Sequence, residues 1–272
     1  MNLCSVKDVR AELTRLDLRP LRRFGQNFLI DRNILDIILD AADISSTDRI
    51  LEVGPGLGVL TEPMAVRCEH LTCVERDFKL IDFLKGQFAG SDKVEIIGSD
   101  IMRVNFTAFG VNKCVSNLPY SCGSRFLVDF TAGAAASVIV VMVQEEVAQK
   151  MCVKPGKREF GLMGLLMQMD YTVELVKTVT PGCFWPSPEV DSCIVRMKRR
   201  SEPILSEVEK IFLKKFAKAA FSQRRKKIGV LLRVRAGHDR EAADKVTFLH
   251  DKRPEELVMA EWCLIAQTLC GR

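Results

Sequence analysis

The chain has 272 residues, ten cysteines and a net charge of +5, with 47% hydrophobic and 28% charged residues. These values are ordinary for a globular protein that forms one large domain or two unequal ones. No apolar run approaches the roughly 20 residues that span a bilayer, and the charged N-terminal stretch does not resemble a secretory signal. We therefore expect a cytoplasmic protein that does not act at a membrane.

The cysteines show no CxxC pair, and no histidine pair lies near the closest couples, Cys68 with Cys73 and Cys114 with Cys122. Zinc sites and disulfide frameworks are usually marked by tighter and more regular spacing. Buried free thiols are the favoured interpretation and a metal or disulfide framework is the alternative, so we expect no metal site.

Positive charge is concentrated in residues 196–240, which contain 15 Lys or Arg and only four Asp or Glu. Such a segment beside a mildly acidic remainder indicates a polyanionic partner such as nucleic acid, although charge runs are often only solvated helix faces. A shorter basic arm precedes Phe24. The predicted contacts with the nucleic acid are Arg22, Arg23, Arg224, Arg225 and Lys226.

The N-terminal half begins with this arm and continues into a glycine-containing turn at residues 24–29, after which a helix is predicted to open at Asp31. Residues 49–53 predict a buried strand that leads into Gly54-Pro55-Gly56-Leu57-Gly58, followed by a helix from about Val59 to Cys68. Glycines there let the backbone turn sharply and approach a ligand. The GxGxG spacing disfavours a nicotinamide dinucleotide site, whose usual pattern is GxGxxG.

Polar side chains end the next three predicted strands. Glu75 follows residues 71–74, Asp100 follows the strand 94–97, and Asn117 follows a short apolar run. The carboxyl ends of parallel strands meet at one edge of a sheet, where a carboxylate 21 residues beyond Gly54 is placed to bind ribose hydroxyls. Any one such residue is more often a helix cap, but together they predict a nucleoside-binding site.

Asn117-Leu118-Pro119-Tyr120 is the most informative tetrapeptide of the chain. The amide oxygen of Asn117 and the backbone carbonyl of Leu118 can both accept hydrogen bonds from a planar amine. Pro119 disfavours a helical conformation at Leu118, and Tyr120 offers a flat face for stacking. A proline-containing loop without function is the alternative for this segment taken alone.

The second half predicts strands at 137–143, 171–178 and 192–197, helices at 144–151 and 162–169, and a basic loop at 154–160. A loop with three prolines, residues 181–188, holds Phe184 and Trp185, which either contribute to the site or fill the core. Beyond residue 200 helical periodicity replaces strand patterns. We therefore expect an α/β domain over residues 1–200 and a small helical domain over 201–272.

These segments together resemble the ribosomal RNA adenine N6,N6-dimethyltransferases. The resemblance rests, in this order along the chain, on Gly25-Gln26-Asn27-Phe28-Leu29, residues 52–58, Asn117-Leu118-Pro119-Tyr120, residues 184–192 and residues 221–226. It implies a Rossmann-like, seven-stranded methyltransferase domain that binds S-adenosyl-L-methionine. The residues that it implies for the cofactor are Asn27, Leu29, Gly54, Gly56, Glu75, Asp100 and Asn117.

The resemblance also implies a reaction and a partner. The substrate would be two adjacent adenines in the 3′-terminal hairpin of small-subunit (16S) rRNA, dimethylated at N6 by a monomer acting on immature 30S subunits. Asn117 and Leu118 would bind the amine, and Tyr120 and Phe184 would stack on the base. The family usually continues after Tyr120 with an Asn-Ile-type segment, whereas this chain has Ser121-Cys122-Gly123-Ser124-Arg125, which could change the substrate preference.

Two other functions fit the same sequence. One is a large-subunit rRNA adenine methyltransferase of the antibiotic-resistance type, which shares the core motifs. The other is a ribosome-assembly factor that keeps the methyltransferase fold without catalysis. The complete set of cofactor residues disfavours the second alternative.

Overall fold

The computed structural model describes residues 2–20, 25–133, 136–237 and 239–271. Contacts within the chain divide it into two compact units. The first comprises Met1–Ala148 and Val173–Arg199, and the second comprises Gln149–Thr172 and Arg200–Arg272. The sequence-based boundaries differ from this division in residues 149–172 and in Arg200, which they assign to the first domain.

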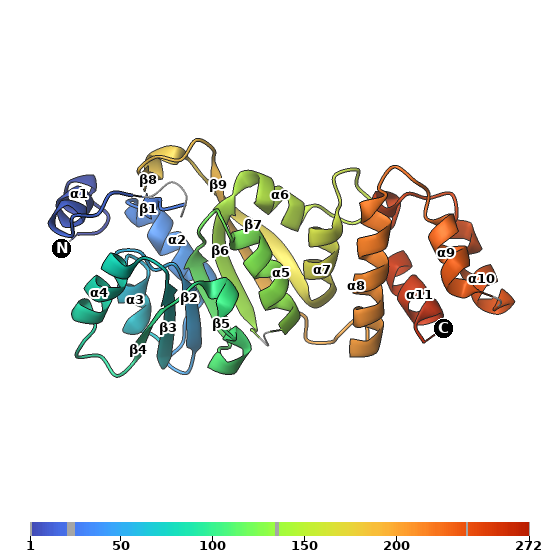
Figure 1. The fold of residues 1–272 in the computed structure, drawn as a ribbon, viewed down its shortest axis with the longest axis horizontal. Coiled ribbons are helices and arrows are strands. Elements are labelled where there is room, and N and C mark those ends of the chain that lie inside the picture. Colours follow the sequence, from blue (N-terminus) through green and yellow to red (C-terminus); the bar gives the residue numbers. More distant parts are fainter. Residues whose placement is uncertain (1, 21–24, 134–135, 238, 272) are drawn as a thin grey trace. The chain divides into compact units, whose positions relative to one another are not determined.

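A seven-stranded sheet with the order β4-β3-β2-β5-β6-β9-β7 forms the centre of the first unit (Figure 1). The pairs β2–β3, β3–β4, β2–β5 and β5–β6 are parallel, and β9 is antiparallel to β6. The order of the strands reverses between β2 and β5, which is the position where open α/β sheets bind ligands. The strands are β2 (Arg49–Val53), β3 (His70–Glu75), β4 (Val94–Gly98), β5 (Lys113–Asn117), β6 (Val138–Gln144), β7 (Tyr171–Val179) and β9 (Ser192–Arg199). The expected Rossmann-like, seven-stranded fold is therefore confirmed.

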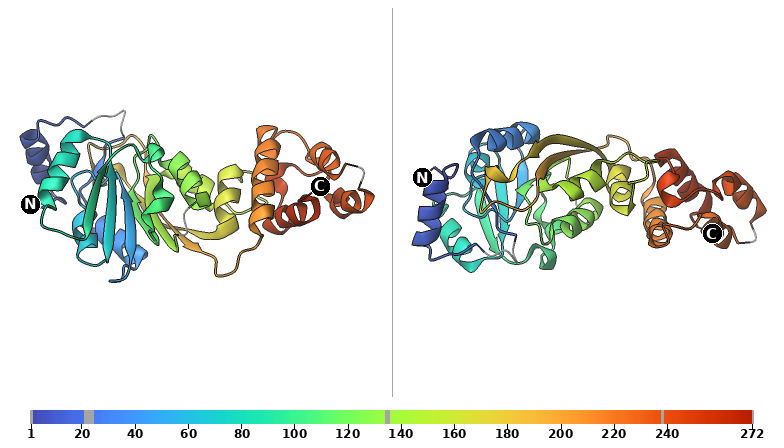
Figure 2. Two further views of the ribbon diagram at one scale, coloured as in Figure 1. Left: turned by 60° about the horizontal axis from the view of Figure 1, so that its bottom comes forward. Right: turned by 90° about the horizontal axis from the view of Figure 1, so that it is seen from above.

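Helices cover both faces of this sheet (Figure 2). Helix α2 (Arg32–Ala42) begins where the carboxylate of Asp31 accepts a hydrogen bond from the Ile34 N–H, 3.1 Å away. Its apolar side packs on alternate residues of β2, β5 and β6 in one hydrophobic cluster, as the helical and strand periods require. Helices α4 (Phe78–Gln87) and α5 (Gly123–Gly133) complete the layers, and η2 (Ile101–Arg103) and η3 (Phe106–Phe109) are short 3₁₀ turns.

Helix α3 (Thr61–Ala65) is shorter than the predicted helix from Val59 to Cys68. Gly58 has a φ of +88°, which lies outside the helical region, so the turn continues to Leu60. Pro63 has no N–H and is tolerated only in a first helical turn, which fixes the start of the helix just before it.

The N-terminal arm contains a helix that the sequence analysis missed. Helix α1 (Val6–Arg15) is capped by the side chain of Ser5 and buries Val9 and Leu13 in a hydrophobic cluster with residues of the first unit. Directly after the arm, β1 (Phe28–Leu29) pairs with β8 (Phe184–Trp185) in a separate two-stranded sheet, and η4 (Pro181–Cys183) precedes β8. The segment before α2 and the loop between β7 and β9 therefore lie side by side.

The second unit is helical and has its own core around Phe160, Phe216 and Trp262. Helix α7 lies in this unit because Leu165 and Met169 are buried in that core, and because Asp170 forms an ion pair of 2.6 Å with Lys210 of α8. Helix α6 (Glu145–Cys152) spans the division of the chain. The remaining elements are α7 (Leu162–Asp170), α8 (Glu207–Ser222), α9 (Gly229–Ala236), α10 (Arg240–Val246), η5 (Thr247–Leu249), η6 (Pro254–Glu256) and α11 (Met259–Leu269).

All ten cysteines are free thiols, and Cys68, Cys73, Cys114 and Cys193 are buried. Within the described parts of the chain, no three His, Cys, Asp or Glu side chains are grouped closely enough to hold a metal ion. None of the helices in these parts has both the length and the apolar character to cross a bilayer.

Candidate active site

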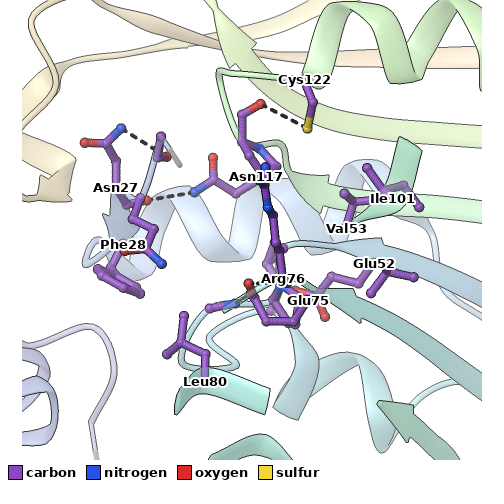
Figure 3. Close-up of a pocket in the computed structure, with 18 of the residues that line it drawn as sticks. Asn27, Phe28, Glu52, Val53, Glu75, Arg76, Leu80, Ile101, Asn117 and Cys122 are labelled. Carbon is purple, nitrogen blue, oxygen red and sulfur yellow. Dashed lines mark hydrogen bonds between the residues drawn. The ribbon is translucent and has the colours of Figure 1, made fainter. Parts of the chain in front are cut away.

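A cavity of about 390 Å³ opens at the carboxyl ends of β2, β3, β4 and β5. Its volume lies within the range of about 300–1,000 Å³ that small-molecule sites occupy. Figure 3 shows Asn27 of the N-terminal turn, Glu75 at the end of β3 and Asn117 at the end of β5 among the residues that surround it. All seven residues predicted to bind the cofactor line this cavity, namely Asn27, Leu29, Gly54, Gly56, Glu75, Asp100 and Asn117.

The glycine turn lies directly against the loop that follows β5. Gly54 has a φ of +68°, and a Cβ atom at this position would lie 2.9 Å from Cγ of Pro119. Gly56 has a φ of +61°, and a Cβ there would lie 3.2 Å from the ring of Phe28. Glycine is therefore required by backbone conformation and by close packing, and it leaves the turn's backbone exposed to a ligand.

Glu75 is almost fully buried, with 7% of its surface exposed, at the end of β3. Its carboxylate accepts hydrogen bonds from the backbone N–H groups of Arg76 (2.7 Å), Asp77 (2.9 Å) and Gly56 (3.2 Å). Burial raises the pKa of the Glu75 carboxyl, and these N–H donors oppose the shift. The carboxylate is thus held in one orientation, with lone pairs left for hydroxyl donors from a ligand.

Asp100 has two roles at the end of β4. It caps η2 by accepting a hydrogen bond of 3.0 Å from the N–H of Met102, and it forms an ion pair of 3.5 Å with Arg76. Asp100 is therefore a helix cap, as the alternative interpretation of the sequence had it. It also lines the cavity.

The side chain of Asn117 is fixed by the N-terminal turn. Its Nδ2 donates a hydrogen bond of 3.1 Å to the backbone carbonyl of Asn27 (Figure 3). An amide whose nitrogen is engaged in this way presents its oxygen elsewhere, so Oδ1 remains available as an acceptor. The next residue, Leu118, donates its N–H to the carbonyl of Met142 at 3.1 Å. Its own carbonyl accepts no hydrogen bond from the described part of the chain.

Tyr120, in the loop after β5, contacts both the N-terminal turn and the first residue of β9. A Cβ on Gly25 would lie 2.8 Å from the backbone nitrogen of Tyr120, so the N-terminal turn is in direct contact with the loop. The hydroxyls of Tyr120 and Ser192 share a hydrogen bond of 2.5 Å, and burial raises the pKa of the tyrosine. The residues on either side, Pro119 and Ser121, line the cavity, whereas Leu118 and Tyr120 lie just outside its lining.

Phe184 lies in the core rather than in the cavity wall. Only 2% of its surface is exposed, and it packs in the cluster between α2 and the sheet, opposite Leu29 in the β1–β8 pair. Its neighbour Trp185 is partly buried, with the guanidinium carbon of Arg10 5.9 Å from the ring centroid. The core-filling alternative therefore describes the position of Phe184.

Several residues of the cavity wall were not predicted. Val9 comes from α1 and Leu3 from the residues before it, and the pattern of Val6, Val9 and Leu13 after Ser5 could have revealed this helix. Ser121, Cys122 and Arg125 come from the segment where the chain departs from the family pattern. Glu52, 2% exposed, accepts a hydrogen bond of 2.7 Å from the Thr61 hydroxyl, and burial raises the pKa of Glu52 to about 8.

The residues predicted to contact nucleic acid have different environments. In the second unit, Arg224 donates from Nη2 to the backbone carbonyls of Phe160 (2.7 Å) and Arg158 (2.5 Å), and its Nε lies 3.6 Å from the carboxylate of Glu255. Arg225 and Lys226 are exposed, and the neighbouring Lys227 pairs with Asp251 at 2.7 Å. Arg22 and Arg23 lie outside the described residues.

The sequence profile of the ribosomal RNA adenine dimethylase family matches residues 19–269. The chain belongs to this family. Membership makes the protein an rRNA adenine dimethyltransferase that uses S-adenosylmethionine, as the motifs predicted.

Relatives of known name match over their whole length. The ribosomal RNA small subunit methyltransferase A of Streptococcus pneumoniae serotype 2 is 33% identical and covers 100% of this chain and 99% of that protein. The protein of the same name from Syntrophus aciditrophicus is 34% identical, with 97% of each chain covered.

Two solved structures share the fold. A dimethyladenosine transferase from Plasmodium falciparum has a TM-score of 0.75 at 22% identity and covers 87% of this chain and 95% of that chain. The 23S rRNA methyltransferase ErmE has a TM-score of 0.70 at 24% identity, with 89% and 99% covered.

Proposed function

We propose that this dimethyltransferase acts on two adjacent adenines in the 3′-terminal hairpin of small-subunit rRNA. The observation that carries the proposal is the orientation of Asn117, whose amide nitrogen is bound by Asn27 while its oxygen stays free beside the glycine turn. The names of the relatives that match over their full length support the small subunit as the source of the substrate.

The cavity fits S-adenosylmethionine in size and in chemistry. The turn at Gly54 and Gly56 would lie along the amino-acid part of the cofactor, because a side chain there is excluded by close contacts. Glu75 would accept hydrogen bonds from both ribose hydroxyls, and Asp100 would accept one from the adenine amine. When bound, the cofactor supplies an electrophilic methyl group on a sulfonium.

Asn117 and Leu118 would activate the target amine. Adenine N6 is a poor nucleophile because its lone pair is delocalised into the ring. Acceptance of its two hydrogens by Oδ1 of Asn117 and the carbonyl of Leu118 would favour tetrahedral geometry and direct the lone pair at the methyl group. Fixed acceptors and close positioning would provide most of the rate enhancement, with no covalent enzyme intermediate.

The reaction repeats on the same nitrogen. In each transfer the N6 lone pair would form the N–C bond as the sulfonium S–C bond breaks to leave a neutral thioether, and one N6 proton would pass to solvent. A monomethylated amine keeps one hydrogen, which either acceptor can bind for the second transfer. The target base must leave its stack, which costs a few kcal/mol. Stacking on Tyr120 would offset about 1–3 kcal/mol of that cost. Because the ring of Phe184 is buried, we assign this residue the role of positioning Leu29 and β1 beside the cavity.

RNA contacts outside the cavity would come from the second unit. Arg225 and Lys226 are exposed and basic, which suits the phosphates of immature 30S subunits. Arg224 would act mainly by holding the basic loop 154–160, whose Arg158 and Phe160 carbonyls it binds. We propose further that the protein acts in the cytoplasm as a monomer, with an N-terminal contribution from Arg22 and Arg23.

Tritiated methyl transfer tests the proposal. Small and large ribosomal subunits from a strain that lacks this activity are incubated with the protein and labelled cofactor, and the labelled nucleotides are mapped by primer extension. We expect label only in small subunits, on two neighbouring adenines near the 3′ end. Label in the large subunit would favour the antibiotic-resistance type of enzyme instead. Cofactor binding without any methyl transfer would favour a non-catalytic assembly factor.

A further inference from the structure

A second cavity of about 980 Å³ adjoins the cofactor cavity in the first unit. The two share Arg76, Ser99 and Asp100 in their linings, so they meet at the ends of β3 and β4. The reaction described above uses no residue that belongs to the second cavity alone. Its wall combines the start of α4, the segment after α1 and the end of η2.

Phe78 is the most unusual residue of this wall. It is the first residue of α4, and 82% of its surface is exposed. The helix turns Leu80, Ile81 and Leu84 into the protein, so its period leaves Phe78 on the solvent side, where a polar residue is expected. An exposed aromatic ring beside a cavity is a typical platform for a planar ligand.

Arginine side chains flank this ring. Arg19 and Arg103 both line the cavity and both are exposed. Neither forms a salt bridge with a described residue, although Arg19 adds to the effect of Lys79 in lowering the pKa of Asp17. Arg19 is held there by its neighbours, because Leu18 is buried in the cluster that contains Leu80 and because Asp17 pairs with Lys79 of α4 at 2.9 Å. Arg103 ends η2, which Asp100 caps.

The acidic residues of the same cavity are engaged within the protein. The carboxylate of Asp17 binds Lys79, and that of Asp100 binds Arg76 and the Met102 N–H. Asp77 caps α4 through the Lys79 N–H at 3.1 Å and accepts a hydrogen bond of 3.1 Å from Gln26. The cavity lining holds the cations Arg19, Arg76, Lys79 and Arg103 against three carboxylates, of which Asp77 is bound only by neutral donors among the described residues. The excess of cations favours an anionic ligand.

We propose that this surface, formed by Arg19, Phe78 and Arg103, binds a single-stranded segment of the substrate RNA next to the target adenine. One base stacks on Phe78, and the flanking phosphates lie against Arg19 and Arg103. Cations beside an exposed aromatic are the combination that binds single-stranded nucleic acid. The inference rests on the proposed function, because it assigns part of the RNA substrate of that same site.

Binding of a labelled single-stranded RNA of about 12 nucleotides, a length within the range of such sites, tests this surface by fluorescence anisotropy. We expect Phe78→Ala to weaken binding roughly ten-fold or more, and Phe78→Trp to restore it. Arg19→Ala with Arg103→Ala should lower the slope of log K against log salt by about 1.4, since each phosphate contact on a single strand contributes about 0.7. The controls are Phe248→Ala, an exposed phenylalanine of the second unit, and Lys85→Ala on α4.

Steady-state kinetics with small subunits separates recognition from chemistry. Phe78→Ala should raise the KM for the subunit while kcat and the Kd for S-adenosylmethionine stay at wild-type values. Wild-type RNA affinity and KM in both variants would overturn the inference and leave the proposed function intact. Tight binding of adenosine monophosphate that Phe78→Ala abolishes would also overturn it, in favour of a free nucleotide. If the wild-type protein methylates no small-subunit RNA, the proposed function fails, and the oligonucleotide measurement still decides this surface.

Discussion

In the cofactor cavity, residues far apart in the sequence share one role, whereas in the basic cluster at residues 224–227 neighbouring residues have different roles. The seven predicted cofactor residues come from five segments, and two of them, Asn27 and Asn117, are hydrogen-bonded although 90 positions separate them in the sequence. All seven line one cavity. The four basic residues are consecutive, yet Arg224 binds backbone carbonyls, Lys227 binds Asp251, and Arg225 and Lys226 face solvent. Parallel strands bring residues that are distant in the sequence to one edge of the sheet. In the turn after α8, by contrast, adjacent side chains point to different partners.

The largest effect is expected for Asn117→Ala. Loss of the acceptor oxygen should lower kcat about 100-fold or more, because a fixed polar group at the reacting atom is removed. The Kd for S-adenosylmethionine should rise much less than kcat falls, since Asn117 is one of seven cofactor residues and the glycine turn and Glu75 remain. Methyl transfer and isothermal titration measure the two quantities, with Asn105→Ala, an exposed asparagine outside the cavity, as the control. An Asn117→Ala protein with a wild-type rate would remove the cavity from the proposed mechanism.

Gly54→Ala tests whether the cavity depends on close packing. The new methyl group would lie 2.9 Å from Pro119 in a backbone conformation that side chains rarely adopt, so we expect loss of cofactor binding by at least ten-fold and a lower melting temperature. Gly110→Ala is the matched control, because Gly110 has a φ of +61° and nothing within 4 Å. It should cost about 1–2 kcal/mol of stability through backbone strain alone and leave cofactor affinity unchanged. Equal cofactor affinities of the two variants would contradict the packing argument.

Substitutions within the basic cluster should affect different properties of the protein. Arg224→Ala is expected to lower stability by about 1–2 kcal/mol, because two hydrogen bonds to the loop 154–160 are lost. Arg225→Ala with Lys226→Ala should leave stability unchanged and reduce the salt dependence of RNA binding. Thermal unfolding and binding at several salt concentrations measure both. If all three substitutions had the same effects, the comparison between the two regions would fail.

A pH dependence of stability is expected from Glu52, a residue that takes no part in the proposed chemistry. Burial raises the pKa of Glu52 from its ordinary 4.5 to about 8, so the folded state retains a proton that the unfolded state has released. The stabilisation is fully present below pH 4.5 and is lost as the pH rises through about 8. Denaturant unfolding at pH 5.5 and 8.5 should show a decline in the wild type that Glu52→Gln removes. A decline of the same size in both proteins would assign it to other groups.

The seven cofactor residues of the cavity could be predicted from the sequence because each belongs to a short local motif. A buried strand followed by GxGxG, and carboxylates at strand ends, imply a place in the fold before any contact is known. The environments of Phe184 and Arg224 could not be read in this way. Burial of Phe184 depends on packing between α2 and the sheet, and the partners of Arg224 lie in a loop more than 60 residues away. Residues 149–172 join the second unit for a similar reason, since their core partners follow residue 200.

The hydrogen bond between Asn117 and the Asn27 carbonyl also has a consequence for the choice between adenine and guanine as the target base. With its nitrogen engaged, the amide can offer the incoming base only an oxygen, and the Leu118 carbonyl offers a second one. Guanine would present its O6 keto oxygen to this pair, so lone pairs would face lone pairs. A single contact from the N-terminal turn would thus let the enzyme discriminate against guanine without reading any base pair.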